Sequence, residues 1–435
     1  MSRRSLVIAL LTPLSLGAQG VANGGARPIS LDEAIRLAQL NAPAAVQARG
    51  QLRSTDAAIR SAKGSFFPTL NLNYGSNKQG GETFFQGQLV PFRGDPWNFN
   101  RSISSNLELF DGGRRLFPLR AARASETAAE SNEVLQKFRV ALDVKQQFFN
   151  VLAARESRAS AEAQLAQSEQ QLASASARVR AGAATVSDSL RSIIQVGNAR
   201  LAVLTAENSL RVSNANLTRL TGTAFEVTAE EVTDSIIPRV SIDSTEVLSA
   251  VESTPSVMQA KADLAAASAS LRASKTPYLP TLNMSYSLSG SRTDDNFALT
   301  GGQFAKANAL RFTLSYPVFN GFTREENIVR SSVAERNAEA QLRDARLAIT
   351  QQVTQYLGAL RLAQERAAIQ IASVEASEED LRVQNQRYAL GASTLLDVLT
   401  SQAQLNSARS ALIQARYDAR VAKAQIEALL GRELP

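Results

Sequence analysis

The sequence of 435 residues contains no His and no Cys, which excludes imidazole and thiolate catalysis, zinc sites built from these residues, and disulfides. Its formal net charge is +7, but Lys and Arg are interspersed with Asp and Glu and form no basic block, so no nucleic-acid partner is expected. Only 6% of the residues are aromatic, whereas Ala, Ser, Gln, Leu and Arg are abundant, which favours long helices.

Adjacent carboxylates such as Glu230-Glu231 and Asp294-Asp295 could suggest acid–base or metal chemistry. They lie in polar stretches without a surrounding pocket pattern, and no Gly-rich phosphate-binding motif of standard spacing occurs. We therefore expect no enzymatic activity, no cofactor and no metal site.

The N-terminus has the pattern of an export signal. Arg3 and Arg4 precede a mostly apolar stretch over residues 6–16, and small residues follow at Gly17, Ala18 and Gly20. The apolar stretch is too short to span a membrane as a helix. We assign residues 1–22 to a signal peptide, with cleavage between residues 18 and 22.

The predicted mature chain opens with a helix of about 35 residues that begins near Leu31 and is interrupted at Pro43. Strict alternation of apolar and polar residues then predicts strands at 69–74 and 102–109, joined by a long loop over residues 76–97 that carries Trp97. After residue 113 the pattern is helical for about 68 residues, or roughly 100 Å.

An internal repeat organises the whole chain. The segment 178–188 returns as 387–397, with Arg, Gly, Thr and Asp in step and the glycines 209 residues apart (391 − 182 = 209). Each copy lies between two helical segments, so we predict the tips of two helical hairpins. Strands are expected again at 282–289 and 310–316. This organisation divides the chain into a first repeat (23–222), a linker (223–245) and a second repeat (246–435).

The helical segments carry apolar residues every seven positions, which predicts supercoiled packing. The longest such series in the second repeat contains Val353, Leu360, Ala367, Val374, Leu381 and Tyr388.

The predicted strands could form either a small soluble sheet or part of a membrane barrel. Their polar face consists of Asn, Ser and Thr, and aromatic residues flank the apolar face, which favours the barrel. Four strands cannot close a barrel, and open edges cannot sit in lipid. The barrel must therefore be shared between copies, and 8, 12 or 16 strands are possible from the sequence itself.

Over nearly its whole mature length, the chain resembles the TolC-type outer membrane efflux proteins. The residues that carry this resemblance are Leu31-Asp32-Glu33-Ala34, Asn41-Ala42-Pro43, Pro68-Thr69-Leu70, Pro280-Thr281-Leu282, Phe110-Asp111-Gly112-Gly113, Phe319-Asn320-Gly321 and the two tips. The resemblance implies a mainly α-helical homotrimer with a 12-stranded β-barrel on an α-helical tunnel. It also implies a location in the outer membrane, with a periplasmic extension.

The resemblance further implies partners and a passive role. A periplasmic adaptor protein would dock to the channel, and an inner-membrane pump or ABC secretion transporter would drive export. The tip residues that match the family's adaptor contact are Ala181, Gly182, Ala183, Leu390, Gly391 and Ala392. The other function considered is a soluble periplasmic coiled-coil adaptor. Drugs, metals and polypeptides all remain possible substrates.

The resemblance also implies a closed gate at the tips. One family restraint pairs a Tyr with an Asp, which correspond here to Tyr388 and Asp188. A second pairs a hydroxyl with an Arg; Ser187 supplies the hydroxyl, but Ser393 stands at the Arg position, so this link lacks its cation.

In one member of the family, two rings of Asp side chains line the constriction, and both Asp residues follow the second tip glycine. This chain has Asp397 at the first and Thr400 at the second, so we expect a single ring of carboxylates. Such a ring would favour cations and would let a multivalent cation block the entrance.

Overall fold

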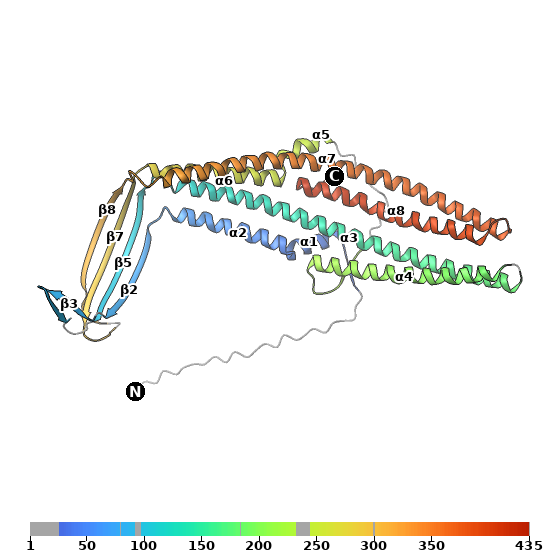
Figure 1. The fold of residues 1–435 in the computed structure, drawn as a ribbon, viewed down its shortest axis with the longest axis horizontal. Coiled ribbons are helices and arrows are strands. Elements are labelled where there is room, and N and C mark those ends of the chain that lie inside the picture. The colour runs from blue at the N-terminus through green and yellow to red at the C-terminus, as the bar shows by residue number, and fades with distance from the viewer. Residues whose placement is uncertain are drawn as a thin grey trace, which may run out of the picture.

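The computed structural model describes residues 26–78, 80–91, 97–182, 184–231, 244–298 and 301–434. The predicted signal peptide, Ala183 and residues 232–243 of the predicted linker lie outside these ranges. Two long helical hairpins lie side by side, and a sheet stands at the end opposite their tips (Figure 1). No helix in the described ranges combines the length and the apolar composition needed to cross a bilayer.

The first repeat contains the elements β1 (Arg27–Ile29), α1 (Leu31–Asn41), α2 (Pro43–Gly64), β2 (Thr69–Lys78), β3 (Glu82–Phe85), β4 (Gln88–Pro91), β5 (Trp97–Phe110), α3 (Leu116–Arg180) and α4 (Val186–Thr221). The connection and the second repeat contain β6 (Val227–Ala229), α5 (Ser244–Ser249), η1 (Ala250–Ser253), α6 (Pro255–Lys275), η2 (Thr276–Tyr278), β7 (Thr281–Asp294), β8 (Ala305–Ser315), α7 (Thr323–Ala389) and α8 (Leu395–Leu430).

The predicted break in the first helix is confirmed. Ser30 caps α1 by accepting a hydrogen bond from the Glu33 amide, 3.3 Å away. The helix ends at Asn41, and Pro43 opens α2, where its missing amide hydrogen leaves no helical bond unmade.

Four strands form one antiparallel sheet in the order β2-β5-β7-β8. The two repeats meet in its middle, where β5 pairs with β7. The prediction of a long loop over 76–97 is wrong for much of this segment: β2 continues to Lys78, β3 and β4 form a hairpin, and Trp97 belongs to β5. The alternation of apolar and polar residues stops at Gly75-Ser76-Asn77, so the sequence pattern ends before the strand does. Backbone pairing between β2 and β5 continues as far as Lys78 and Trp97.

The sheet joins the helices through the same contact in both repeats. The guanidinium of Arg115 lies over the ring of Phe66 at 5.1 Å, and that of Arg324 lies over Tyr278 at 4.5 Å. Asp111 holds Arg115 in place through an ion pair of 2.8 Å. Each strand-to-helix turn is thus anchored to the helix end that precedes the repeat's first strand.

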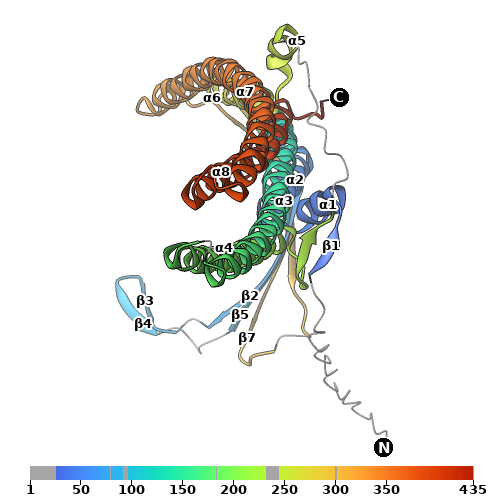
Figure 2. The same ribbon diagram turned by 90° about the vertical axis from the view of Figure 1, so that its right-hand side faces the viewer.

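Short helices stack end to end beside a long one in each repeat (Figure 1). The long helices α3 and α7 have 65 and 67 residues, and their partners α4 and α8 have 36 each. In Figure 1, α1 and α2 continue the line of α4 along α3, and α6 continues the line of α8 along α7. Viewed from the tips, the helices form a curved layer (Figure 2).

Glycine is required where the stacked helices meet. Gly222 follows α4 with φ +65°, and a Cβ there would lie 2.8 Å from Cβ of Asn41. The side chain of Asn41 also donates a hydrogen bond to the carbonyl of Thr221, at 3.0 Å. In the second repeat, a Cβ on Gly431 would lie 2.5 Å from Pro255. Any larger residue would therefore separate the helix ends.

Two clusters of buried apolar residues lie where the stacked helices meet, a region that we call the waist. One cluster contains the buried residues Ile29, Val144, Phe148, Val151, Leu217 and Val227. A second contains Val257, Val353, Leu360 and Ile426. The seven-residue spacing predicted for the second repeat is confirmed, since Val353, Leu360, Ala367 and Leu381 are buried. The parallel pair β1–β6, which the sequence analysis did not predict, covers the first cluster.

Polar contacts tie the first hairpin to the second along α3 and α8. Lys145 and Glu427 form an ion pair of 2.6 Å whose side chains are 19% and 8% exposed. Farther toward the tips, Tyr417 donates a hydrogen bond of 2.6 Å to Glu156, and burial and this bond raise the pKa of its hydroxyl. These partly buried contacts restrict how the two hairpins can move against each other, since moving them apart would leave the buried polar groups without partners.

We expect Lys145→Met to destabilise the protein by about 2 kcal/mol, because it removes the nearer ammonium from the buried Glu427 carboxylate and leaves it only Lys423, 3.9 Å away. The control Arg158→Met removes an exposed pair with Glu162 and should cost much less, because solvent screens that pair. Urea unfolding followed by far-ultraviolet circular dichroism compares the two. Equal losses would contradict the role assigned to the buried pair.

Candidate functional site

The two hairpin tips lie together at one end of the molecule (Figure 1). The first tip joins α3 to α4 and the second joins α7 to α8. Gly182 and Gly391 take φ values of +74° and +75°, with no atom near the place of a Cβ. Backbone conformation, not crowding, therefore requires glycine at both turns.

The recurring Thr and Asp of the repeat begin the returning helices. Thr185 accepts a hydrogen bond from the Asp188 amide, and the Asp188 carboxylate accepts bonds from the amide and hydroxyl of Thr185 at 3.2 and 2.9 Å. Thr394 and Asp397 repeat this arrangement, with both bonds to the carboxylate at 2.8 Å. Both pairs are capping boxes. The spacing of three residues between Thr and Asp is a local signal for such a cap and is already visible in the sequence.

The cap also tunes the acidity of Asp397. The amide and the hydroxyl of Thr394 both donate to its carboxylate and hold its pKa below the usual range. Asp397 is exposed and is therefore ionised at neutral pH. This suits the carboxylate ring expected from the sequence.

Tyr388 lies between the two hairpins. Its ring packs against the small cluster of Leu381, Val398 and Leu405, and the guanidinium of Arg178 lies over it at 4.8 Å. Among the hydrogen bonds of the described residues in this single chain, none joins Tyr388 to Asp188. The predicted partner of Tyr388 is thus engaged in its own cap, and Arg178 occupies the ring's face.

The remaining predicted gate residues are exposed or half-buried. Ser393 is half-buried and donates a long hydrogen bond of 3.4 Å to the carbonyl of Gln384. Thr400 bonds within its own helix, to the carbonyl of Leu396 at 2.9 Å. Ser187 is exposed in the first turn of α4.

The predicted adaptor-contact residues that the structure describes are all exposed. Ala181 and Gly182 form the first tip, while Ala183 lies outside the described residues. At the second tip, Gly391 and Ala392 are exposed, and Leu390 has 85% of its surface accessible. An apolar side chain this open at a turn is available to a partner.

A glutamine cluster links the hairpins just above the tips, and sequence reasoning missed it. Gln402 of α8 is 2% exposed. Its amide nitrogen donates to Gln164 at 2.6 Å, and its amide oxygen accepts from Gln167 at 2.7 Å; both partners belong to α3. Between this cluster and the tips lies a polar cavity of about 310 Å³ lined mainly by α3 and α7, including Arg178 and Tyr388. The first hairpin can thus separate from the second only by breaking these buried bonds.

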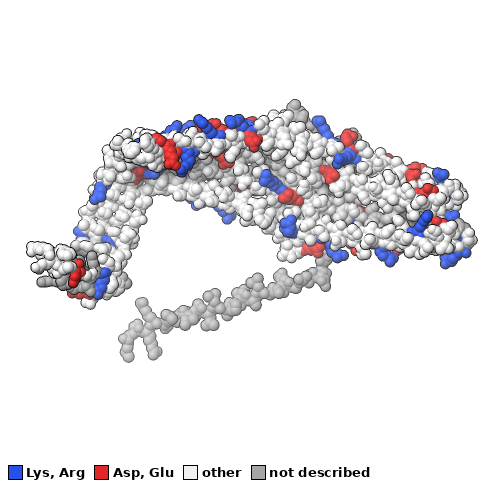
Figure 3. Space-filling view, viewed as in Figure 1, with Lys and Arg blue, Asp and Glu red and all other residues white. Residues whose placement is uncertain are grey.

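Acidic and basic residues are spread over the helices, and the strands are mostly uncharged (Figure 3). No cluster of three or more carboxylates able to hold a metal ion occurs in the described part of the chain.

The long paired hairpins, the sheet at one end and the exposed tips define a mainly helical channel subunit. A family model described as outer membrane efflux protein matches residues 34–223 and 248–432. The chain belongs to this outer membrane efflux protein family.

Curated relatives agree with this assignment. The chain is 25% identical to CyaE of Bordetella pertussis over 386 residues, which cover 88% of this chain and 79% of CyaE. It is 25% identical to OpmQ, a pyoverdine export outer membrane protein of Pseudomonas aeruginosa, over 89% of this chain and 81% of OpmQ. It is 24% identical to the outer membrane protein TolC of Vibrio cholerae, over 92% and 90%.

Solved structures share the fold. The Vibrio cholerae outer membrane protein VceC superposes with a TM-score of 0.76 at 16% identity and covers 93% of this chain and 97% of its own. The Campylobacter jejuni outer membrane channel CmeC gives 0.75 at 15% identity, over 99% and 94%.

The protein is therefore an outer membrane channel for efflux or secretion, with a periplasmic helical portion. Of the two functions considered from the sequence, these comparisons support the channel and not the soluble periplasmic adaptor. Channels of this family are trimers that work with an adaptor and an inner-membrane pump.

We expect Thr394→Ala to cost about 1 kcal/mol locally, since it removes the hydroxyl that caps α8. Amide hydrogen exchange in the first turn of α8 should accelerate about fivefold, whereas Thr394→Ser should leave it unchanged. Equal protection in the Ala and Ser variants would contradict the capping role.

The stabilising effect of the Asp397 carboxylate should depend on pH. Its pKa is lower in the folded protein, so the contribution is complete above the unfolded value of about 3.9 and is lost as the pH falls through the folded value. Hydrogen exchange in wild type and Asp397→Asn should differ at pH 6 and converge as the pH falls below the folded pKa of Asp397. A difference that grows on acidification would refute this assignment.

Proposed function

We propose that three copies of this chain form one conduit, in which twelve strands make a shared membrane barrel and the hairpins make a tunnel into the periplasm. The sheet order supports this, because among the described residues β2 and β8 are the edge strands and each has a paired neighbour on one side only. Their unpaired backbone groups would each cost several kcal/mol in lipid. Pairing β8 of one copy with β2 of the next satisfies both edges.

Exposed apolar side chains support the same assembly. Leu72 on β2 and Leu314 on β8 are 77% and 70% exposed, as expected of a face that contacts lipid. A helical stripe along α4 is also open, and it contains Leu190, Ile194, Leu201, Leu204 and Val212. A neighbouring copy would cover this stripe, because a monomer rarely leaves such a long apolar track in water.

The tips act as the gate in this proposal. Three Asp397 carboxylates would form one ring that attracts cations, with Thr400 in place of a second ring. Tyr388 would restrain the second hairpin against the first, together with Asp188, Ser187 and Ser393. The contact between Tyr388 and Arg178 supports a restraint at this level, although with a different partner from the one expected.

The exposed tips would receive a periplasmic adaptor through Ala181, Gly182, Ala183, Leu390, Gly391 and Ala392. Small residues and an open backbone allow a partner helix to approach closely, and Leu390 offers an apolar anchor. The channel itself would be passive and not an enzyme, so an inner-membrane pump or ABC transporter supplies the energy. Because a wide tunnel selects weakly, the pump partner would determine which compound is exported.

The assembly predicts a membrane-bound protein. The mature chain should require detergent for extraction, and it should migrate as a trimer in unheated denaturing gels and in analytical ultracentrifugation. A monomer that dissolves without detergent would contradict the shared barrel.

The gate predicts altered conductance. In planar bilayers, Asp397→Asn should weaken block by trivalent cations about tenfold while retaining much of the cap, since Asn can still accept hydrogen bonds. Arg409→Gln, which removes an exposed ion pair of 2.6 Å with Glu378, is the charge-changing control. Unchanged block in Asp397→Asn would remove Asp397 from the constriction.

Tyr388→Leu should raise the fraction of time that the channel is open, because it removes the aromatic face on which Arg178 rests. Tyr388→Phe keeps this face and removes only the hydroxyl. An effect of Leu alone assigns the restraint to Arg178, and an equal effect of Phe assigns it to a hydrogen bond of the hydroxyl. No effect of either would exclude Tyr388 from the gate.

A further inference from the structure

A basic row crosses the sheet near the strand ends that lie farthest from the helices. Arg101 on β5 pairs with Gly290 on β7, and Gly290 pairs with Lys306 on β8. The next row toward the helices is apolar, with Ile103 opposite Leu288. Residues in register share a face, so both cations border the apolar face of the sheet.

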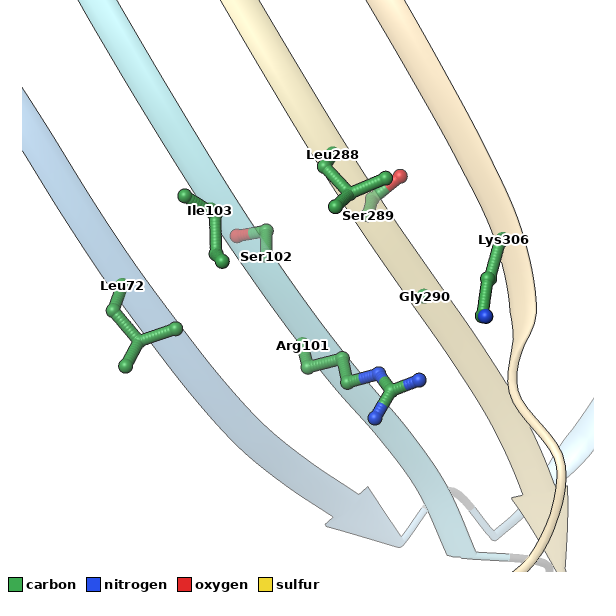
Figure 4. Close-up of a pocket in the computed structure, with 8 residues that line it drawn as sticks. All are labelled: Leu72, Arg101, Ser102, Ile103, Leu288, Ser289, Gly290 and Lys306. Atoms are coloured by element: carbon green, nitrogen blue, oxygen red, sulfur yellow. The ribbon is translucent and has the colours of Figure 1, made fainter.

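Gly290 makes room for the Arg101 side chain. A Cβ at this position would lie 3.0 Å from Nε of Arg101 and 3.3 Å from Cβ of Phe304. Arg101 therefore crosses β7 toward β8, and its guanidinium lies 4.0 Å from the centre of the Phe304 ring. Figure 4 shows Arg101 and Lys306 on either side of Gly290, beside Leu72, Ile103 and Leu288, around a hollow of about 430 Å³.

The two cations have no acidic partner here. None of the ion pairs among the described residues includes Arg101 or Lys306, and both side chains are exposed. Arg292, one row farther out, differs because it donates to the carbonyls of Gly301 and Ala298 and lies over the Phe99 ring. Arg292 thus serves the structure, while Arg101 and Lys306 present uncompensated positive charge.

The row lies at the depth of a membrane interface. Gly290 follows Thr281, the first residue of β7, by nine positions (290 − 281 = 9). At about 3.4 Å per residue and a tilt of about 45°, this is roughly 20 Å along the membrane normal, near the edge of an apolar band of about 25 Å. Just beyond it, the rings of Trp97 and the exposed Phe297 meet edge to face, as expected of an aromatic girdle, and both pack on the buried Phe99.

We propose that Arg101 and Lys306 bind the phosphate of a lipid headgroup in the outer leaflet. The proposal rests on the proposed function, in which the apolar face of the sheet contacts lipid and the helices are periplasmic. Arg offers a planar pair of donors to phosphate oxygens and Lys adds a point charge. The apolar row next to them would contact acyl chains. One amphiphile would therefore pair its phosphate with the two cations and fill the hollow with its chains.

The test uses the full mature protein in a nonionic detergent, titrated with diphosphoryl lipid A. The double variant Arg101→Gln/Lys306→Gln should bind about tenfold more weakly than wild type. Lipid A without its phosphates should bind wild type as weakly as the variant. Gly290→Val keeps both charges but displaces Arg101, and should also weaken binding.

Arg311→Gln is the matched control, because it removes one charge from the same strand as Lys306 but on the opposite face. It should bind lipid A as wild type does. Equal loss in this control, or unchanged binding in the double variant, would overturn the proposal. Displacement of lipid A by millimolar inorganic phosphate would also overturn it, since the site would then be a general anion site.

The outcomes separate this inference from the assembly on which it rests. Each variant is also inserted into planar bilayers and examined for trimers. Variants that conduct as trimers but bind lipid A like wild type refute only the lipid site. A wild-type protein that neither forms trimers nor conducts would refute the proposed function instead.

Discussion

The structure depends on how the backbone of four strands satisfies its hydrogen bonds. Within one chain, β5 and β7 are paired on both sides, whereas β2 and β8 are open at the sheet edges. In the proposed assembly, neighbouring copies pair with these edges, since open edges are not tolerated in lipid. The long helices extend from this sheet, and the anchors at Arg115 and Arg324 transmit its orientation to them. In that proposal, assembly in the membrane would determine how the tips of the three copies meet.

The tips illustrate how one residue serves two purposes. Asp397 begins α8 as part of a capping box, and the same hydrogen bonds keep its carboxylate ionised. Asp188 has the equivalent place in the first hairpin. A helix start needs only the cap, so the recurrence of Thr and Asp is explained without any gate. A charged ring in the trimer would use a carboxylate that the fold already requires.

The contacts within each hairpin differ from the contacts between the two hairpins. Contacts within each hairpin are extensive, while the hairpins meet mainly along α3 and α8. There, buried polar groups such as Lys145, Glu427 and Gln402 must find partners, which gives the interface one preferred geometry. Any movement that opens the tips has to break or rearrange the glutamine contacts nearest to them. The waist contacts lie farther from the tips and can serve as the fixed end of that movement.

The sequence by itself determined the repeat, the long helices, the break at Pro43, the tips and the alternating strands, because periodicity, Gly and Pro act locally. It also contained the capping boxes, whose spacing is local as well. Only the tertiary structure decided the full length of β5, the pairing of β1 with β6, and the partners of Tyr388, Gln402 and Arg101. These depend on which distant segments meet, and a polar residue on a helix or strand carries no local mark of its partner.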